Sequence, residues 1–181
     1  MKKLWTSAVV LVVMVFACAA YSARADQDDA TVLRARMNGF NEVPPKLTDA
    51  SGLFTATVVN GDHIDFTLTF SNLTGPPAAA HLHFGPRQNT GGVFLFLCGG
   101  GNQPACPTST SGTITGTAGA TNVVAQIPDQ GIPAGEFAPA LRAIRSGLTY
   151  ANMHTAKFPG GEIRGQVKVR GHGDDDDDDR D

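Results

Sequence analysis

The residues of this sequence that are best suited to chemistry are three histidines in two short segments. His81 and His83 lie in Ala-His-Leu-His-Phe-Gly (80–85), and His154 lies in Tyr-Ala-Asn-Met-His-Thr (150–155). On a β-strand, residues two apart share a face, with Cα atoms about 6.5–7 Å apart. Two imidazoles at this spacing can reach one metal ion at about 2.0–2.1 Å. A third histidine would complete a three-nitrogen site with an open position, suited to copper or zinc.

The histidines also have an interpretation without a metal. A His-x-His pair alone is a weak signal, because neutral imidazoles often serve as hydrogen-bonding groups in turns. Of the two other histidines, His63 falls on the polar face of an expected hairpin and His172 falls in the C-terminal tail. We expect both to be solvated.

A second candidate site is the turn Lys-Phe-Pro-Gly-Gly-Glu-Ile-Arg-Gly (157–165). Glu162 and Arg164 are two apart on an expected strand and therefore share a face, where they could form an ion pair. Alternatively, Arg164 could reach Glu42. In both arrangements the charged residues could form a purely structural ion pair. Alternatively, the carboxylate and the guanidinium could line a ligand cleft.

These residues must be positioned by an all-β body. Apolar and polar residues alternate over 53–70 on both sides of Asn60-Gly61, a pair typical of tight hairpin turns. The same alternation over 163–169 predicts the last strand. Shorter strands are expected at about 31–38, 80–84, 92–98, 110–116, 122–127 and 149–154. About eight short strands predict an antiparallel β-barrel or sandwich, Greek-key-like, and the helical spacing of Phe137, Leu141 and Ile144 predicts one short helix at about 135–146, which would cap an open end.

The two ends of the chain differ from this body. Lys2 and Lys3 followed by an apolar run and Ala23-Arg24-Ala25 predict a cleavable signal peptide over 1–25, with 26–30 as a short linker. A retained helix or a lipid on Cys18 is the alternative. Residues 171–181 contain six consecutive aspartates, which predict a disordered, solvating tail or a loose site for hard cations such as calcium.

The mature chain would keep two cysteines, Cys98 and Cys106, on either side of a Gly-rich loop. In an exported protein such a pair most simply forms a disulfide. The spacing does not fit a Cys-x-x-Cys redox motif, and a zinc knuckle would need further thiols.

Size and charge limit the partners. Residues 31–170 have the length of one domain and show no basic stripe along the sequence, so we do not expect a nucleic acid to bind. After signal cleavage, no membrane association is expected.

Four ordered motifs resemble the CHRD domain, the module repeated in the extracellular regulator chordin and found alone in many exported microbial proteins. They are Glu42-Val43-Pro44-Pro45, His81 to Gly85, Tyr150 to Thr155 and Pro159 to Gly165. The resemblance implies an exported antiparallel β-barrel or sandwich without a settled activity. It also implies that His81, His83 and His154 converge, because the family pattern carries all three.

The His-x-His on a β-body also looks like the copper side of copper-zinc superoxide dismutases, which hold two metals with six histidines and an aspartate. Three candidate histidines cannot build that pair. We therefore expect a periplasmic or secreted binding module for copper, zinc or an extracytoplasmic protein partner. The alternatives are a mononuclear copper enzyme acting on a small oxidant or radical, and a purely structural interaction domain.

Overall fold

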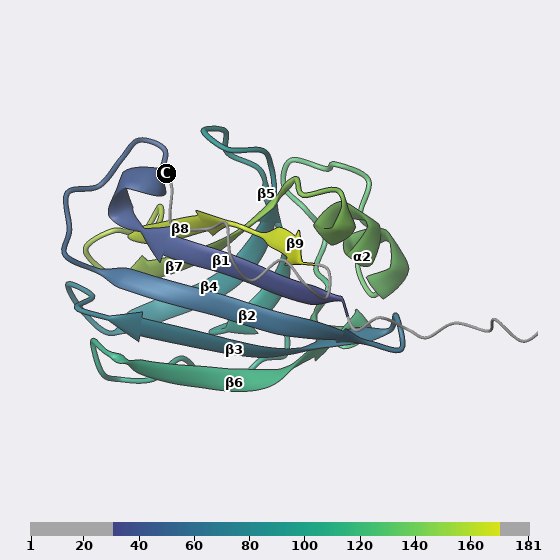
Figure 1. The fold of residues 1–181 in the computed structure, drawn as a ribbon, viewed down its shortest axis with the longest axis horizontal. Coiled ribbons are helices and arrows are strands. Elements are labelled where there is room, and N and C mark those ends of the chain that lie inside the picture. Colours follow the sequence, from purple (N-terminus) through teal and green to yellow (C-terminus); the bar gives the residue numbers. More distant parts are fainter. Residues whose placement is uncertain (1–30, 171–181) are drawn as a thin grey trace, which may run out of the picture.

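The fold is a nearly closed antiparallel β-barrel of eight strands, with a short ninth strand paired to one of them and one short helix (Figure 1). A computed structural model describes residues 31–170. The expected signal peptide, the linker, Cys18, His172 and the acidic tail lie outside the described residues. The barrel decides between the two architectures expected from the sequence.

The strands follow one another along the chain, and the longest connection, residues 120–148, separates the sixth strand from the seventh. They are β1 (Val32–Asn38), β2 (Ser51–Val59), β3 (His63–Ser71), β4 (Pro77–Phe84), β5 (Gly92–Cys98), β6 (Gly112–Gly119), β7 (Thr149–Thr155), β8 (Ile163–Gln166) and β9 (Lys168–Arg170). Two 3-10 helices, η1 (Gly39–Asn41) and η2 (Ala120–Asn122), and the helix α2 (Phe137–Arg145) complete the fold. The expected last strand is divided between β8 and β9.

The order of strands around the barrel is β5-β4-β7-β8-β1-β2-β3-β6, and β9 pairs with β1. Consecutive strands pair at β1–β2, β2–β3, β4–β5 and β7–β8. In contrast, β3 pairs with β6, β4 with β7 and β1 with β8. The chain therefore crosses between distant positions of the sheet, as the Greek-key-like expectation requires.

The barrel closes between its two edge strands through a short segment after β6. Val123 forms an isolated bridge with Leu95 of β5, and the amide of Val124 donates to the carbonyl of Phe94 at 3.0 Å. The strand expected at 122–127 is therefore wrong. The segment starts from the 3-10 helix η2 and touches β5 at one bridge only, so its apolar residues fill the gap in the barrel instead of extending a ladder.

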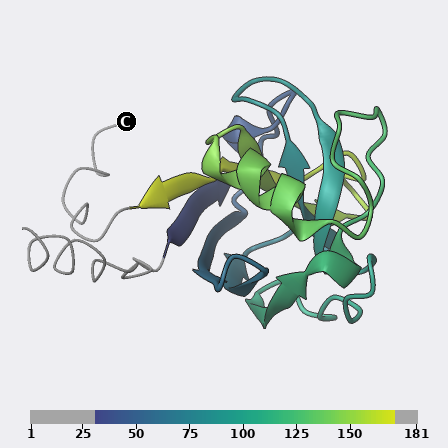
Figure 2. The same ribbon diagram turned by 90° about the vertical axis from the view of Figure 1, so that its right-hand side faces the viewer.

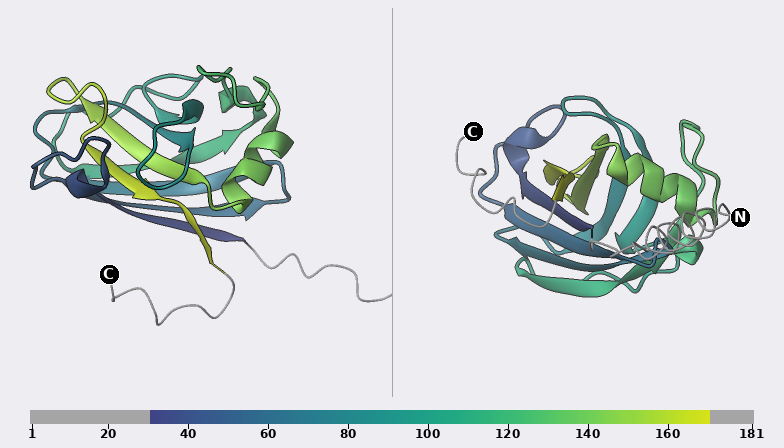
Figure 3. Two further views of the ribbon diagram at one scale, coloured as in Figure 1. Left: turned by 90° about the horizontal axis from the view of Figure 1, so that it is seen from above. Right: turned by 45° about the vertical axis from the view of Figure 1, so that its right-hand side comes forward.

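The helix α2 lies across one end of the barrel (Figure 2), as its sequence pattern predicted. Its buried residues are Phe137, Ala140, Leu141, Ala143 and Ile144, which form one apolar face toward the barrel. Two further views show the strands wrapping around a common interior with the helix at its rim (Figure 3). No helix within residues 31–170 is long and apolar enough to cross a membrane.

Strand alternation separates the core from the outer wall. Leu82, Ala151, Met153, Ile163 and Leu33 come from neighbouring strands and are fully buried in the core. Residues between them in sequence point to the outside of the barrel, because successive side chains of a strand face opposite ways. The candidate histidines belong to this outer set.

Candidate metal site

The pairing of β4 with β7 places the three histidines on one patch of the outer wall. His81 lies opposite Asn152, His83 opposite Tyr150, and His154 opposite Ala79. Directly opposed residues of an antiparallel pair share a face, and diagonal neighbours remain within reach of long side chains. His154 is thus the diagonal neighbour of His81, and Leu82, between the two β4 histidines, enters the core.

The three rings lie close enough for one ion. A nitrogen from each of His81, His83 and His154 lies within 4.8 Å of the other two. The ring centroids of His81 are 4.7 Å from His83 and 4.5 Å from His154. Bonds of about 2.0–2.1 Å to one ion would bring the nitrogens to about 3.3 Å, which small side-chain rotations can supply. In the described part of the chain, no other group of three or more His, Cys, Asp or Glu side chains has this arrangement.

Hydrogen bonds select the nitrogen that each of two rings offers. His83 Nδ1 lies 2.8 Å from the carbonyl of Gly91, and His154 Nδ1 lies 3.0 Å from the carbonyl of Pro159. A carbonyl only accepts, so both Nδ1 atoms carry the proton and donate, which leaves each Nε2 with a lone pair. Fixing one imidazole nitrogen in this way is the usual support of a metal-binding histidine.

The nitrogens that remain are buried and unpartnered. His83 Nε2, His154 Nε2 and His81 Nδ1 have no hydrogen-bond partner in the structure. A buried polar atom left without a partner costs about 1–3 kcal/mol. Two of the rings bond loop carbonyls through Nδ1, but the carbonyls leave the second nitrogen of each ring without a partner.

Burial keeps the imidazoles neutral. It lowers the pKa of His81 from 6.5 to about 2, with further lowering from the neighbouring His154 and His83. Burial also lowers the pKa of His83 to about 4, although the hydrogen bond to Gly91 opposes the shift, and it lowers the pKa of His154. All three lone pairs are therefore available at neutral pH without the loss of a proton.

Aromatic neighbours hold the rings from the sides. The ring of Tyr150 stacks on that of His83, and the ring of Phe96 on β5 meets His81 edge-on, with centroids 5.0 Å apart. Tyr150 also accepts a hydrogen bond through its hydroxyl from the amide of Gly91 at 3.2 Å. Gly91 must be glycine, since a Cβ there would lie 1.8 Å from the carbonyl oxygen of Phe84. The same residues thus position both His83 and the carbonyl that fixes it.

The turn before β8 supports His154. Glu162 is fully buried and accepts hydrogen bonds from the hydroxyls of Thr48, Thr74 and Thr155 and from the amide of Thr74, all at 2.7–2.9 Å. This network anchors the turn that carries the Pro159 carbonyl. Glu162 therefore lies in a threonine-lined interior.

Arg164 and Glu42 lie beside the histidines on the same outer face. Arg164, opposite Asn38, places its Cζ 3.4 Å from the centroid of Tyr150 and donates to the carbonyl of Pro86 at 2.9 Å. Glu42 accepts a hydrogen bond from Asn152 at 2.6 Å. Burial raises the pKa of Glu42 from 4.5 to about 7, although Asn152 and the positive charge of Arg164 oppose the shift. The sequence offered Glu162 or Glu42 as the partner of Arg164. In the structure Glu162 is bonded by threonines, whereas the charge of Arg164 acts on Glu42.

The sequence missed the supporting residues of the site. Gly91, Pro159 and Phe96 act through a carbonyl or a ring edge, and no residue type signals such roles. Tyr150 and Asn152 could have been found, because they alternate with His154 along one strand and so share its face.

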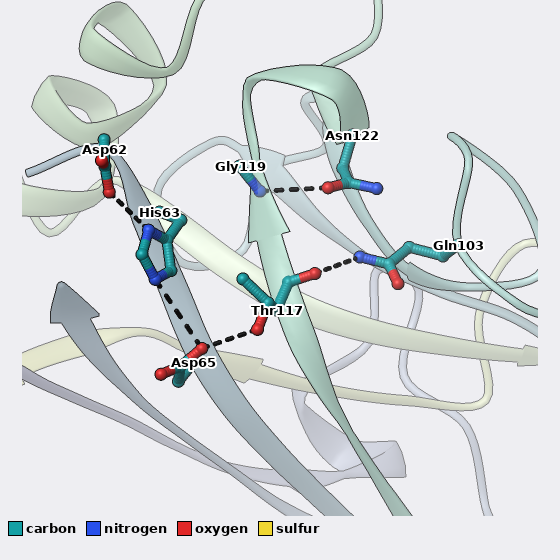
Figure 4. Close-up of polar contacts among 7 residues, drawn as sticks. All are labelled: Asp62, His63, Asp65, Gln103, Thr117, Gly119 and Asn122. Atoms are coloured by element: carbon teal, nitrogen blue, oxygen red, sulfur yellow. Dashed lines mark hydrogen bonds and ion pairs between the residues drawn. The ribbon is translucent and has the colours of Figure 1, made fainter.

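His63 lies away from the three histidines. It begins β3, which is separated from β7 by β8, β1 and β2 in the sheet. Its Nδ1 contacts Asp62, its Nε2 lies 3.9 Å from Asp65, and Asp65 accepts a hydrogen bond from Thr117 (Figure 4). This histidine belongs to a half-exposed polar surface.

Cys98 and Cys106 form the expected disulfide, with Cα atoms 5.0 Å apart. The bond closes the loop that follows β5, and Phe96 lies on this same strand. The disulfide therefore ties down the connection next to the histidine patch.

Comparison with known proteins gives one match. The family model of the CHRD domain matches residues 33–167, which is nearly all of the described chain. No curated protein and no solved structure matches the chain significantly.

Proposed function

The chain belongs to the CHRD domain family, and we propose that it is an exported binding module that holds one transition-metal ion, copper or zinc, through His81, His83 and His154. The binding atoms are Nδ1 of His81 and Nε2 of His83 and His154. The disulfide and the predicted signal peptide are compatible with a location outside the cytoplasm.

The observation that carries this proposal is the set of three buried, unpartnered imidazole nitrogens. Two of the rings already donate their other nitrogen to a carbonyl, so their free lone pairs have a fixed direction. A single divalent ion would satisfy all three atoms at once, whereas three separate partners would each need room in a tightly packed patch.

Imidazole ligands favour copper and zinc over calcium or magnesium, which prefer oxygen. The described residues do not support a two-metal centre of the superoxide dismutase type. They contain four histidines, and His63 lies several strands away from the other three. The proposed site is mononuclear.

The test is metal analysis of the protein purified without a polyhistidine tag, after loading with copper or zinc and removal of excess metal. We expect one equivalent of metal, and Cu²⁺ spectra with nitrogen coupling. His81→Ala, His83→Ala and His154→Ala should each weaken binding at least about 100-fold, since three ligands become two.

His63→Ala is the matched control and should bind like the parent. Circular dichroism of each variant separates a lost ligand from a lost fold. Substoichiometric copper and zinc in the loaded parent, or equal binding by the parent and all three histidine variants, would overturn the proposal.

A further inference from the structure

A second feature of the outer wall is a basic cleft, separate from the histidine patch. It is a cavity of about 480 Å³ beside β1, β8 and the loop after β4. Its charged lining residues are Arg34, Arg36, Glu42, Arg87, Arg164 and Lys168, and the exposed ring of Phe40 lies at its edge. We call this cavity the basic cleft.

The cations meet there because of strand register. Arg34 and Arg36 alternate on β1 with Leu33, Ala35 and Met37, which are buried in the core. Arg34 lies directly opposite Lys168 of β9. This pairing places two cationic side chains next to each other on the same face of the sheet.

The charge balance of the basic cleft is strongly positive. Five of the ten Lys and Arg residues of the described chain line it, but only one of the seven Asp and Glu residues does. That one carboxyl is Glu42, whose pKa burial raises to about 7, so it supplies only a partial negative charge at neutral pH. A basic groove of this kind suits a ligand with several closely spaced carboxylates.

The chain itself contains such a ligand. Asp174–Asp179 is a run of six aspartates that starts four residues after Arg170, the last residue of β9. Four extended residues reach about 14 Å and nine reach about 30 Å, which is enough for the chain to turn back from β9 to the basic cleft. A short tether also gives such a segment an effective concentration in the millimolar range.

We propose that the basic cleft is a binding site for acidic peptide and that its occupant is the run Asp174–Asp179 of the same chain. Carboxylates of this run would lie among the cationic side chains that line the cleft. Binding of this run does not require a metal at the histidines.

The test compares the full chain with a variant in which Asp174–Asp179 are all replaced by asparagine, which keeps the length and removes the charge. Fluorescently labelled hexa-aspartate peptide is titrated into each at low salt. The neutral-tail variant should bind the peptide at least about tenfold more tightly than the parent, because millimolar tethered carboxylates compete in the parent. Raising the salt to about 1 M should abolish binding in both.

Charge-matched substitutions in the neutral-tail background locate the site. Arg34→Gln with Arg36→Gln should weaken peptide binding at least tenfold. Arg142→Gln with Arg145→Gln on α2 removes the same charge away from the cleft and should have little effect. Thermal unfolding confirms that both double variants fold.

Three results would overturn the proposal. One is equal peptide affinity of the parent and the neutral-tail variant, which would assign the cleft to a free anion. Another is no peptide binding by either protein. The third is equal loss in the two double variants, which would show a response to overall charge alone.

Discussion

The imidazole of His83 lies flat against the phenol ring of Tyr150, with 4.5 Å between ring centroids and 5° between ring planes. The guanidinium of Arg164 also contacts the ring of Tyr150, 3.4 Å from its centroid. One aromatic side chain therefore separates the histidine patch from the basic cleft and fixes the orientation of a proposed metal ligand.

Tyr150→Leu should lower metal affinity about 10- to 100-fold while the protein stays folded, because the ring that orients His83 is lost. Tyr150→Phe keeps the stacked ring and loses only the hydrogen bond from Gly91, so its affinity should stay within a few-fold of the parent. The measurement is competition with a chelator of known affinity. Equal affinities of the leucine variant and the parent would show that the stacking does not position His83.

Metal binding at pH 6 should release less than one proton. Three solvated histidines with a pKa near 6.5 would release about two protons at this pH. In the folded protein, burial lowers the pKa of His81 to about 2 and of His83 to about 4, so these two rings are already neutral, and burial also lowers the pKa of His154. Calorimetry in buffers of different ionisation enthalpy counts the protons. A release near two would contradict the neutral state of the rings.

The free energy of unfolding of the parent should fall as the pH rises from about 4.5 to 7, and Glu42→Gln should abolish this fall. The folded state holds the Glu42 proton to a pKa of about 7, against 4.5 for the unfolded chain. The folded protein therefore binds more protons in this interval, and its free energy of unfolding falls as the pH rises, by up to about 3 kcal/mol.

Glutamine stays neutral and keeps an acceptor for Asn152. Denaturant titrations of parent and variant at pH 5 and pH 8 give the difference directly, and contributions from the histidines cancel. A difference that does not change with pH would show that Glu42 ionises normally.

Glu162→Ala should lower the free energy of unfolding by roughly 3–5 kcal/mol, since four donors lose the fully buried carboxylate that accepts from them. Glu162→Gln should cost less, because threonine hydroxyls can rotate to accept from its amide. Glu136→Gln, at an exposed carboxylate before α2 without a capping hydrogen bond, is the control and should change stability by less than about 0.5 kcal/mol. Equal effects at positions 162 and 136 would contradict the role of the threonine network.

Local patterns of the sequence predicted most of the elements. Alternation over 53–70 corresponds to β2 and β3 in register, with Val59 opposite His63, because a half-buried strand shows its period directly. The helical spacing of Phe137, Leu141 and Ile144 predicted α2 for the same reason. The strand predicted at 122–127 is wrong. The apolar residues Val123 and Val124 contact β5 at the gap in the barrel and do not form a strand.

The sequence by itself determined that His81 and His83 share a face, that Leu82 between them is buried, and that Cys98 and Cys106 can pair, because each depends on spacing along the chain. Tertiary structure alone decided which side of the barrel wall carries the histidines, and that carbonyls of Gly91 and Pro159 fix two of the rings. It also decided that Arg34 and Lys168, 134 residues apart, lie face to face in one cleft. These relationships arise because strands that are distant in sequence pair with each other. The sequence of one strand alone does not determine which strand it pairs with or in which register.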